Sequence, residues 1–388
     1  MMPLVGKVQR VLLVADLEDW VLGELARQLA RRLPATVCVT SMVSHAPGFA
    51  RSYRAEQRRH DLVHFLSPWD FFEWAPYTRL PCVVTLWHMI DWQPFDAHAG
   101  RIDMLLVGSR QWRERLAEHL PPGTPVDRMP YGLDTDRFRR DADARPRFLA
   151  ESGLPADTTV IGFTGSAWSD EFARKGLERL WDCAEAIAAR GLARFVVRLA
   201  GRGWRTELVP ARLRAHVHVD GFIPSEDLPC FYSSLDLYLC PSRAEGVPYP
   251  VLESMSCEAV VLSTPVGVVP ELLVDAVNGF MLEHERLVGD FLTAFDRLRG
   301  DPARCREIGA AARQAVIGRF DWQRAVDLSP CERAYAEARA RFDRRPRADR
   351  ARFAIGGSVG LLLRPARVRL RLGARLATLR SGGGESRR

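Results

Sequence analysis

The chain has 388 residues, of which 47% are hydrophobic and 27% charged, as in an ordinary soluble globular protein. This length suits two domains and an appendage better than one core. No stretch approaches the roughly 20 apolar residues that span a bilayer, and the start of the chain lacks a signal-peptide pattern. The eight cysteines are scattered without CxxC spacing, which argues against disulfides or structural zinc and favours a cytoplasmic location.

The formal net charge of +7 arises from the end of the chain. Residues 344–388 hold 13 arginines against two acidic residues, a net of +11, so the rest of the chain sums to −4. Lysine occurs only at Lys7 and Lys175, whereas arginine is abundant. We therefore treat Lys175 as a candidate functional residue.

Strand and helix patterns alternate through residues 10–120. The strand candidates are apolar or β-branched runs, and the helix candidates have apolar residues at helical spacing. We expect strands at 10–16, 35–41, 61–67, 81–87 and 103–109, and helices at 20–33 and 110–120. Such alternation predicts a parallel sheet covered by helices.

A polar segment interrupted by glycine and proline follows at 131–158, and we expect it to connect two domains. The alternation then restarts. Strands are expected at 159–166, 194–201, 217–222, 236–242 and 260–265. Helices are expected at 176–191, 227–235 and 250–259, two within 290–317, and a long one over 320–342 that breaks at Pro330.

The predicted fold class is α/β, with two doubly wound Rossmann-like domains facing a cleft, where ligands of such sheets bind. We expect an N-terminal domain at 1–150, a C-terminal domain at 151–325, a C-terminal helix at 326–343 and a basic tail at 344–388.

The stretch "RAEGVPYPVLESMS", residues 243–256, places a carboxylate on each side of a predicted helix start. Pro250 suits the first position of that helix, whose free N–H groups and dipole favour an anion such as a diphosphate. Glu245 lies before the helix and Glu253 about one turn inside it. Carboxylates accept strong hydrogen bonds from sugar hydroxyls, so the layout fits a nucleotide-sugar. Chance placement of two glutamates, with helix-dipole stabilisation, is the alternative.

This stretch and its continuation, "PSRAEGVPYPVLESMSCEAVVLSTPVGVVPELL", resemble the donor-site signature of retaining glycosyltransferases of family 4, which have the GT-B fold. Other pieces follow in the family's order: "RMPYGLDTDRF", "VIGFTGS…RKGL", "VHVDGFIPSEDLPCFYSSLDLYLCPS" and "VNGFML". The resemblance covers roughly residues 60–325. It implies that the first domain serves the acceptor and the second binds the nucleotide-sugar donor.

The resemblance also implies roles for individual residues. Glu245 would contact the transferred sugar and Glu253 the ribose, while Lys175 would contact the diphosphate. Backbone N–H groups around Gly246, chiefly those of Val247 and Tyr249, would line the sugar and phosphate. A solvent-exposed lysine at a helix start is the alternative for Lys175.

The loop after the first strand of the second domain departs from the family pattern. Family members usually follow the strand's glycine, here Gly165, with an arginine and then a lysine about six residues on. Here Ser166 takes the arginine's place, and Lys175 comes ten residues after Gly165. Arg174 is the candidate for the missing cation; weaker phosphate binding or a different donor are the alternatives.

In the first domain, His88 in "VVTLWHMIDW" corresponds to a family histidine near the donor sugar and acceptor, one residue later than expected. Capping a strand or packing beside Trp87 is the alternative. The family's Gly-rich first loop is replaced by "ADLEDWVLGE". Its acidic residues are candidates for acceptor contact or solvated loop charges: Asp16, Glu18 and Asp19.

We expect no metal and no cofactor. Asp134–Asp136 reads as a metal-binding DxD, but it follows "PYG" and precedes "RF" as a non-metal loop does in this family. The phosphate charge would instead be met by Lys175, Arg174 and a helix end. The resemblance implies transfer with retention, in which the leaving phosphate oxygen accepts the acceptor's proton. No protein nucleophile is then required.

The arginines and leucines of the tail suggest a basic amphipathic segment on an anionic membrane surface. This predicts a cytoplasmic enzyme, peripheral at the inner membrane face, with a glycan or lipid-linked acceptor. A disordered basic tail is the alternative, and specific nucleic-acid binding is not expected. For the whole chain, the alternatives to a glycosyltransferase are a nucleotide-sugar epimerase on the same fold and a non-catalytic nucleotide-sugar-binding partner.

Overall fold

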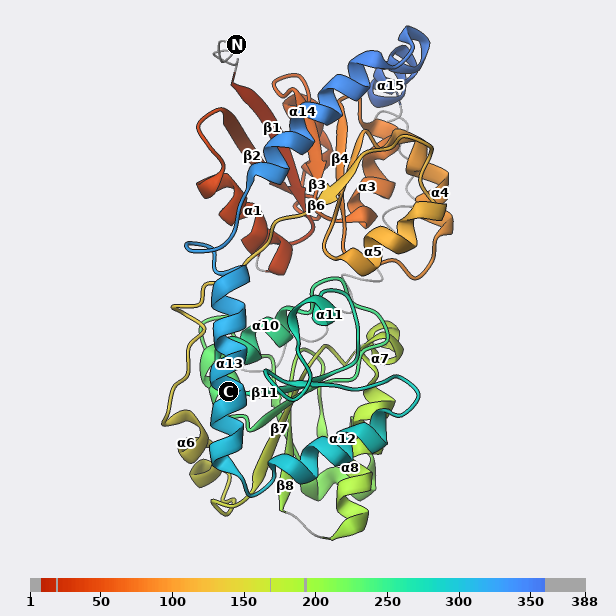
Figure 1. Cartoon of the computed structure of the whole chain (residues 1–388). Helices are drawn as coiled ribbons and strands as arrows, with labels where there is room; N and C mark the ends of the chain where they lie inside the picture. Colours follow the sequence, from red (N-terminus) through yellow and green to blue (C-terminus); the bar gives the residue numbers. More distant parts are fainter. Residues whose placement is uncertain (1–7, 19, 168, 192–193, 360–388) are drawn as a thin grey trace, which may run out of the picture. The chain divides into compact units, whose positions relative to one another are not determined.

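The chain packs into two compact units in a computed structural model that describes residues 8–18, 20–167, 169–191 and 194–359 (Figure 1). The first unit holds the described residues up to Val107, Arg115–Met129 and the described part from Leu328 onward. The second unit holds Gly108–Glu114 and Pro130–Asp327. Each unit contains one parallel sheet with helices on its faces.

The sheet of the first unit has six parallel strands in the order β2-β1-β3-β4-β5-β6. The strands are β1 (Gln9–Ala15), β2 (Val37–Val43), β3 (Leu62–Phe65), β4 (Cys82–Leu86), β5 (Met104–Val107) and β6 (Val126–Arg128). Its helices are α1 (Val21–Arg32), α2 (Phe49–Glu56), α3 (Pro68–Trp74), η1 (Ala75–Tyr77), α4 (Gln93–His98), η2 (Ala99–Arg101) and η3 (Leu116–Glu118), whereas α5 (Arg110–Arg115) belongs to the second unit up to Glu114. Strands β3, β4 and β5 are buried along their whole length, as strands of a parallel sheet covered on both faces must be.

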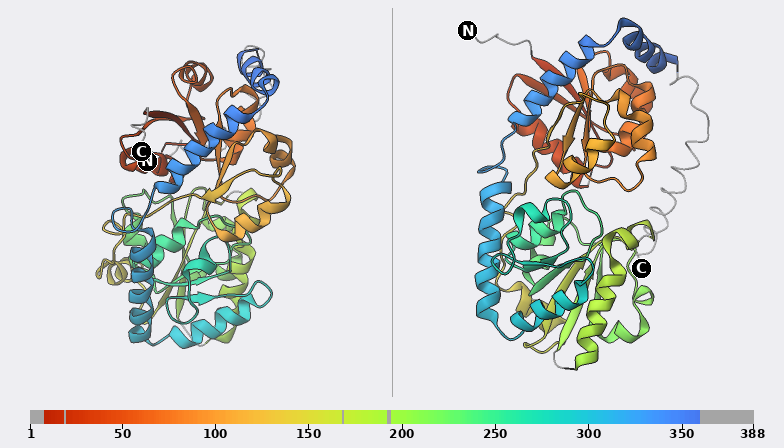
Figure 2. Two further views of the ribbon diagram at one scale, coloured as in Figure 1. Left: turned by 45° about the horizontal axis from the view of Figure 1, so that its top comes forward. Right: turned by 45° about the vertical axis from the view of Figure 1, so that its right-hand side comes forward.

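The last helices return to the first unit. Helix α14 (Ser329–Arg344) packs against β3, β4, β5 and β6 (Figures 1 and 2). Helix α15 (Arg347–Val359) packs against η1. Pro330 lies in the first turn of α14, so it begins the helix and does not break a longer one, and the residues before Ser329 are not helical. A proline is tolerated there because the first N–H groups of a helix have no partner within it.

A buried hydrogen-bond chain holds α14 on this sheet. His64 of β3 lies between the hydroxyl of Tyr335 on α14, 3.0 Å from Nδ1, and that of Thr85 on β4, 2.8 Å from Nε2. Burial lowers the pKa of His64 to about 3, so the ring is neutral and can donate one bond and accept the other.

The sheet of the second unit also has six parallel strands, in the order β12-β11-β10-β7-β8-β9. They are β7 (Thr159–Thr164), β8 (Phe195–Ala200), β9 (Val217–Gly221), β10 (Leu237–Cys240), β11 (Val260–Ser263) and β12 (Phe280–Met281). The main helices are α6 (Ala144–Glu151), α7 (Ser169–Lys175), α8 (Leu177–Arg190), α9 (Leu228–Ser233), α10 (Tyr249–Ser256), α11 (Val269–Leu272), α12 (Leu287–Leu298) and α13 (Pro302–Phe320). Strand β10 lies between β7 and β11, so its carboxyl end is central to the sheet.

The predicted α/β class, with two parallel sheets and a C-terminal helix, is confirmed. Several elements were not predicted, among them strands β6 and β12 and helices α2, α3, α4, α6, α7, α11 and α15. Helix α6 lies within the stretch expected to be a plain connection, and α7 within the stretch expected to be a loop. Most of the predicted basic tail, residues 360–388, lies outside the described residues.

The contact between α14 and the first sheet gives a stability prediction. We expect Tyr335→Phe to lower the free energy of unfolding by about 1–3 kcal/mol, because His64 Nδ1 is left buried without its partner. Urea denaturation followed by circular dichroism measures this change. Tyr77→Phe is the control, since that hydroxyl has no hydrogen bond to a described residue; an equal loss in both variants would contradict the assignment.

Candidate nucleotide-sugar site

Glu245 is the centre of a charged cluster at the carboxyl end of β10. Its side chain is only 7% exposed, and its Oε2 lies 2.7 Å from Nη1 of Arg174. Its Oε1 lies 2.9 Å from Nζ of Lys175 and accepts a 3.0 Å hydrogen bond from the hydroxyl of Ser242. Burial of a single carboxylate costs several kcal/mol, and here two cations and a hydroxyl offset that cost.

Both cations come from the last turn of α7. The chain reverses directly after them at Gly176, whose φ of +68° suits glycine. A Cβ at this position would lie 2.1 Å from the carbonyl oxygen of Pro241, so only glycine allows the turn to approach the end of β10 so closely. The N–H of Arg243 then donates to the carbonyl of Arg174 at 2.8 Å. The backbone therefore holds the end of α7 against the loop that carries Glu245.

Residues of α5 fix the backbone of the same loop. The indole N–H of Trp112 donates to the carbonyl of Glu245 at 2.7 Å. Gln111 donates to the carbonyl of Pro265 at 3.0 Å and accepts from the N–H of Gly267 at 2.8 Å. These two residues were missed in the sequence because nothing in a short helical pattern reveals a contact more than 130 residues away.

Gly165 and Ser166 follow β7 and lie beside the lysine. A Cβ placed on Gly165 would lie 3.8 Å from Cγ of Lys175, so the two predicted residues are neighbours. The carbonyl of Gly165 accepts a 2.7 Å hydrogen bond from the indole of Trp204, which fixes the start of the loop. Ser166 is half-buried. Helix α7 spans most of the extra residues between Gly165 and Lys175 and delivers Arg174 to the cluster.

Glu253 lies on α10, which begins at Tyr249, so Pro250 is its second residue and not its first. The carboxylate of Glu253 is half-buried and accepts a 2.7 Å hydrogen bond from the hydroxyl of Tyr232. Burial raises its pKa to about 7, against the smaller lowering effects of this bond and of the charge of Arg137. Glu253 is therefore a carboxylate that lacks full charge compensation. It is suited to accept hydrogen bonds from a ligand.

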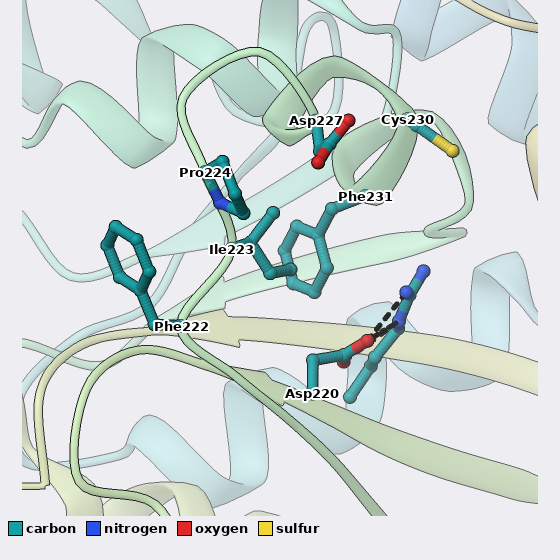
Figure 3. A pocket seen from close by; sticks show the side chains of 8 residues that line it. Asp220, Phe222, Ile223, Pro224, Asp227, Cys230 and Phe231 are labelled. Carbon is teal, nitrogen blue, oxygen red and sulfur yellow. Dashed lines mark hydrogen bonds and ion pairs between the residues drawn. The ribbon is translucent and has the colours of Figure 1, made fainter. Parts of the chain in front are cut away.

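A cavity of about 290 Å³ lies where β9 ends and α9 begins (Figure 3). Apolar side chains form much of its wall, and the ion pair of Arg198 with Asp220, at 2.6 Å, borders it. Phe231 lines the cavity, and the next residue of α9, Tyr232, bonds to Glu253. Its remaining lining residues are Phe222, Ile223, Pro224, Asp227 and Cys230.

The structure places the remaining predicted residues in other segments of the chain. His88 follows β4 in the first unit and is half-buried. Asp16 and Glu18 follow β1, and Asp19 lies outside the described residues. Asp134 accepts from the N–H groups of Asp136 and Arg137 at 3.2 and 3.0 Å, as in a turn. Over the described ranges, no group of three His, Cys, Asp or Glu residues is arranged to hold a metal ion.

Part of the chain matches a known family model. Residues 158–301 match the family model "Glycosyl transferases group 1". The chain is 27% identical over 233 residues to a GDP-mannose-dependent alpha-(1-6)-phosphatidylinositol monomannoside mannosyltransferase of Mycolicibacterium smegmatis, covering 57% of this chain and 59% of that protein. It is 30% identical over 209 residues to an alpha-D-kanosaminyltransferase of Streptomyces kanamyceticus, covering 53% and 52%. The chain thus spans between half and three fifths of these relatives' lengths.

The fold is shared with solved structures. Sucrose-phosphate synthase from Thermosynechococcus elongatus superimposes with a TM-score of 0.64 at 19% identity, covering 81% of this chain and 96% of that one. The predicted GT-B class and the resemblance to group 1 glycosyltransferases are confirmed. Within the described residues, no helix has the length and apolar character needed to cross a bilayer.

The raised pKa of Glu253 predicts a pH-dependent stability. A carboxyl whose folded pKa lies near 7, above its ordinary 4.5, costs stability progressively as pH rises through this interval. We expect Glu253→Gln, which cannot ionise, to become more stable relative to the wild type between about pH 5 and pH 8. Urea denaturation across this range tests it, with exposed Glu226→Gln as the control. A difference that stays constant with pH would contradict the assignment.

Proposed function

We propose that this protein, whose residues 158–301 belong to the group 1 glycosyltransferases, transfers a glycosyl group from a nucleoside-diphosphate sugar to an acceptor with retention of anomeric configuration. The observation that carries the proposal is the buried carboxylate of Glu245 between the cations of Arg174 and Lys175. A carboxylate for hydroxyl groups and two cations for phosphates lie within one hydrogen-bonded cluster. These are the groups that the sugar and diphosphate of such a donor require.

The donor is expected to lie along the carboxyl edge of the second sheet. The base would enter the cavity after β9, whose walls include Phe222, Ile223 and Phe231. The ribose would bond to Glu253, and the diphosphate would meet Lys175, Arg174 and the N–H groups at the start of α10. The sugar would then reach Glu245 and the backbone of Gly246, Val247 and Tyr249.

The ion pairs of Glu245 also bear on how a donor would bind. Arg174 and Lys175 neutralise the buried carboxylate of Glu245. A bound diphosphate offers these cations more negative charge than the carboxylate does, and the sugar hydroxyls replace part of what Glu245 loses. We therefore expect donor binding to redistribute these contacts within the same cluster.

We propose that catalysis is electrostatic and requires no divalent metal. The two cations and the helix end would stabilise the negative charge that develops on the leaving diphosphate. Its departing oxygen would accept the proton of the attacking hydroxyl on the same face of the sugar, which preserves the anomeric configuration. Glu245 would hold the sugar in position without forming a covalent bond.

The acceptor is proposed to be a glycan or a lipid-linked molecule bound by the first unit, with His88 near the reacting groups. The relative from M. smegmatis is named for a phosphatidylinositol mannoside and for GDP-mannose, which makes GDP-mannose the first donor to test. We place the protein in the cytoplasm, at the inner face of the membrane, with residues 344–388 in contact with anionic lipid.

One observation favours a second candidate function, a non-catalytic nucleotide-sugar-binding partner. Ser166 stands where the family usually has an arginine, so the site has one fewer cation on this loop. Arg174 occupies the charged cluster instead. If Arg174 cannot take over the phosphate, the protein would bind a donor without turning it over.

A panel of nucleoside-diphosphate sugars tests the donor site by thermal shift. A donor at a hundredfold excess over its dissociation constant stabilises the folded protein by about 2.7 kcal/mol. We expect Lys175→Ala and Glu245→Ala to weaken both this shift and donor turnover at least about a hundredfold. The matched control is Arg194→Ala, an exposed arginine of the same unit that pairs with Asp157. Equal effects in the control and site variants would refute the site.

Product analysis by NMR tests the stereochemical outcome. With an α-linked donor sugar, the product is expected to carry an α linkage, formed equally well in the presence of a metal chelator. An inverted product, or turnover that requires added Mg²⁺ or Mn²⁺, would contradict the mechanism. Donor binding without turnover of any acceptor would favour the binding-partner function.

A further inference from the structure

Two carboxylates lie at the carboxyl edge of the first sheet, next to strands β1 and β3. Asp16 directly follows β1, and Asp70 lies in the first turn of α3, which follows β3. Strand β1 pairs with β2 on one side and with β3 on the other, so the chain changes direction across the sheet at this point. Ligands of open α/β sheets bind outside the carboxyl ends of the strands at such a switch point.

Asp70 is buried, and one of its two carboxylate oxygens has no partner. The residue is only 3% exposed. Its Oδ1 accepts a 2.7 Å hydrogen bond from the hydroxyl of Ser44, which follows β2. Its Oδ2 is buried and, among the residues that the structure describes, has no hydrogen-bond donor. A buried polar atom without a partner is rare in folded proteins, and it points to a bound group that supplies a donor or a charge.

Asp70 also interacts with two other acidic side chains. Burial raises its pKa to about 7, against the hydrogen bond from Ser44, and the charges of Asp16 and then Glu73 raise the pKa further. Over the described ranges, neither Asp16 nor Asp70 forms a salt bridge, and their hydrogen bonds come from a backbone N–H and a hydroxyl. The mutual repulsion of these two carboxylates would be relieved by a cation bound beside them.

Asp16 is the more accessible of the two carboxylates. Its side chain is half-buried, and its Oδ1 accepts a 2.7 Å hydrogen bond from the N–H of Leu17. Burial raises the pKa of Asp16, against this bond and the smaller effect of His45. A ligand that approaches from solvent therefore meets Asp16 first, with the negative charge of Asp70 close by.

The loops at this edge lack arginine and lysine, although the chain holds 55 such residues. These loops, which follow β1 to β4, are residues 16–20, 44–48, 66–67 and 87–92. The guanidinium of Arg27 on α1 reaches the first loop, but it bonds to the carbonyl of Glu18 at 2.9 Å and to the carboxylate of Glu24. The edge is therefore negatively charged, which attracts a cationic ligand and not a phosphate.

Two tryptophans of the same loops and helix starts have exposed rings. Trp20 directly precedes α1 and is 41% exposed, and Trp69 precedes Asp70 in α3 and is 49% exposed. The face of an aromatic ring packs against apolar C–H groups, such as those of a sugar ring, and it also attracts cations. Carboxylates beside such rings fit a ligand that is both a sugar and a cation.

We propose that this edge binds an acceptor sugar that carries a protonated amino group. The ammonium group would contact Asp16, and Asp70 would act as a positioning residue whose negative charge strengthens the contact. An ammonium group offers three N–H donors and a positive charge, whereas a hydroxyl leaves the charge of the two carboxylates uncompensated. The ligand's role as acceptor rests on the proposed glycosyl transfer, but its binding to this edge does not.

Binding of such a sugar should depend on pH through Asp70. Asp70, whose pKa lies near 7, is largely protonated at pH 6, and as pH rises it ionises and adds negative charge next to Asp16. The affinity for an ammonium group should therefore rise through this range, and the affinity for a neutral sugar should not. Glu73 interacts with Asp70 and His45 with Asp16, so a variant of Asp70 is needed to separate its effect from theirs.

Titration followed by NMR measures sugar binding to the whole chain, without a donor and in the presence of a metal chelator. The probes are methyl glucosides with an amino group at C2, C3 or C6, and methyl glucoside is the neutral reference. We expect at least one amino sugar to bind at least about tenfold more tightly than the reference at pH 7. Asp16→Asn should remove most of this preference.

The matched control is Asp343→Asn, which removes an exposed carboxylate from the opposite edge of the same sheet. Asp343 lies near the end of α14, two residues before Arg345, and Arg345 pairs with Asp103 directly before the start of β5. The control should bind every probe like the wild type.

The pH series uses the amino sugar that binds most tightly, and the titration of its own amine is followed in the same spectra and corrected for. Between pH 6 and pH 8 the affinity of the wild type should rise about fivefold. Asp70→Asn keeps an acceptor for the hydroxyl of Ser44 but cannot ionise, so its affinity should stay nearly constant. A residue with a merely structural role would leave the pH dependence as it is.

Four outcomes would overturn the proposal: amino sugars that bind no more tightly than methyl glucoside, an Asp16→Asn variant that keeps the preference, an Asp343→Asn variant that loses it equally, and an Asp70→Asn variant that keeps the pH dependence of the wild type. Thermal shifts with nucleoside-diphosphate sugars should be unchanged in these variants. Donor binding without amino-sugar binding would contradict only this inference. Amino-sugar binding without donor binding would contradict only the proposed function.

Discussion

The cost of burying the carboxylate of Glu245 constrains much of the second unit. A lone carboxylate that is 6% exposed would not remain ionised at the end of a sheet strand. Two cations from the end of α7 and a hydroxyl from the loop after β10 compensate it. The tight turn at Gly176 and the reversal into α8 follow from this requirement. So does the contact between the end of α7 and the loop after β10.

A second constraint acts on the backbone around that carboxylate. Gly267 has a φ of +55°, and a Cβ there would lie 2.0 Å from the carbonyl oxygen of Gly246. The loop after β11 is therefore in direct contact with the loop after β10. From α5, Gln111 hydrogen-bonds to the first of these loops and Trp112 to the second. Such a rigid arrangement can present backbone N–H groups and charges to a ligand without reorganisation, which is the usual source of electrostatic catalysis.

The parts of this fold that could be predicted from the sequence are those marked by a pattern of neighbouring residues. Buried apolar runs marked most strands, and helical spacing marked α1, α8 and α12. The candidate residues of the second unit were found from one short stretch, a family resemblance and the rarity of lysine. The structure brings Lys175, Arg174 and Glu245 together, and places Gly165 beside Lys175. Their roles toward a donor remain predictions.

The parts that were missed depend on contacts between distant residues. Helix α7 is short and polar, and its sequence alone does not distinguish it from a loop. Trp112 and Tyr232 read as ordinary helix residues, although one fixes the carbonyl of Glu245 and the other bonds to Glu253. The start of α14 at Ser329 was misplaced because Pro330 fits both a break and a first turn.

A structure of the protein in complex with a nucleoside-diphosphate sugar tests the central claim most directly. The account predicts diphosphate oxygens within hydrogen-bonding distance of Lys175 Nζ and of the first N–H groups of α10, with sugar hydroxyls on Glu245 and the ribose on Glu253. A donor bound elsewhere, with the ion pairs of Glu245 unchanged, would contradict it.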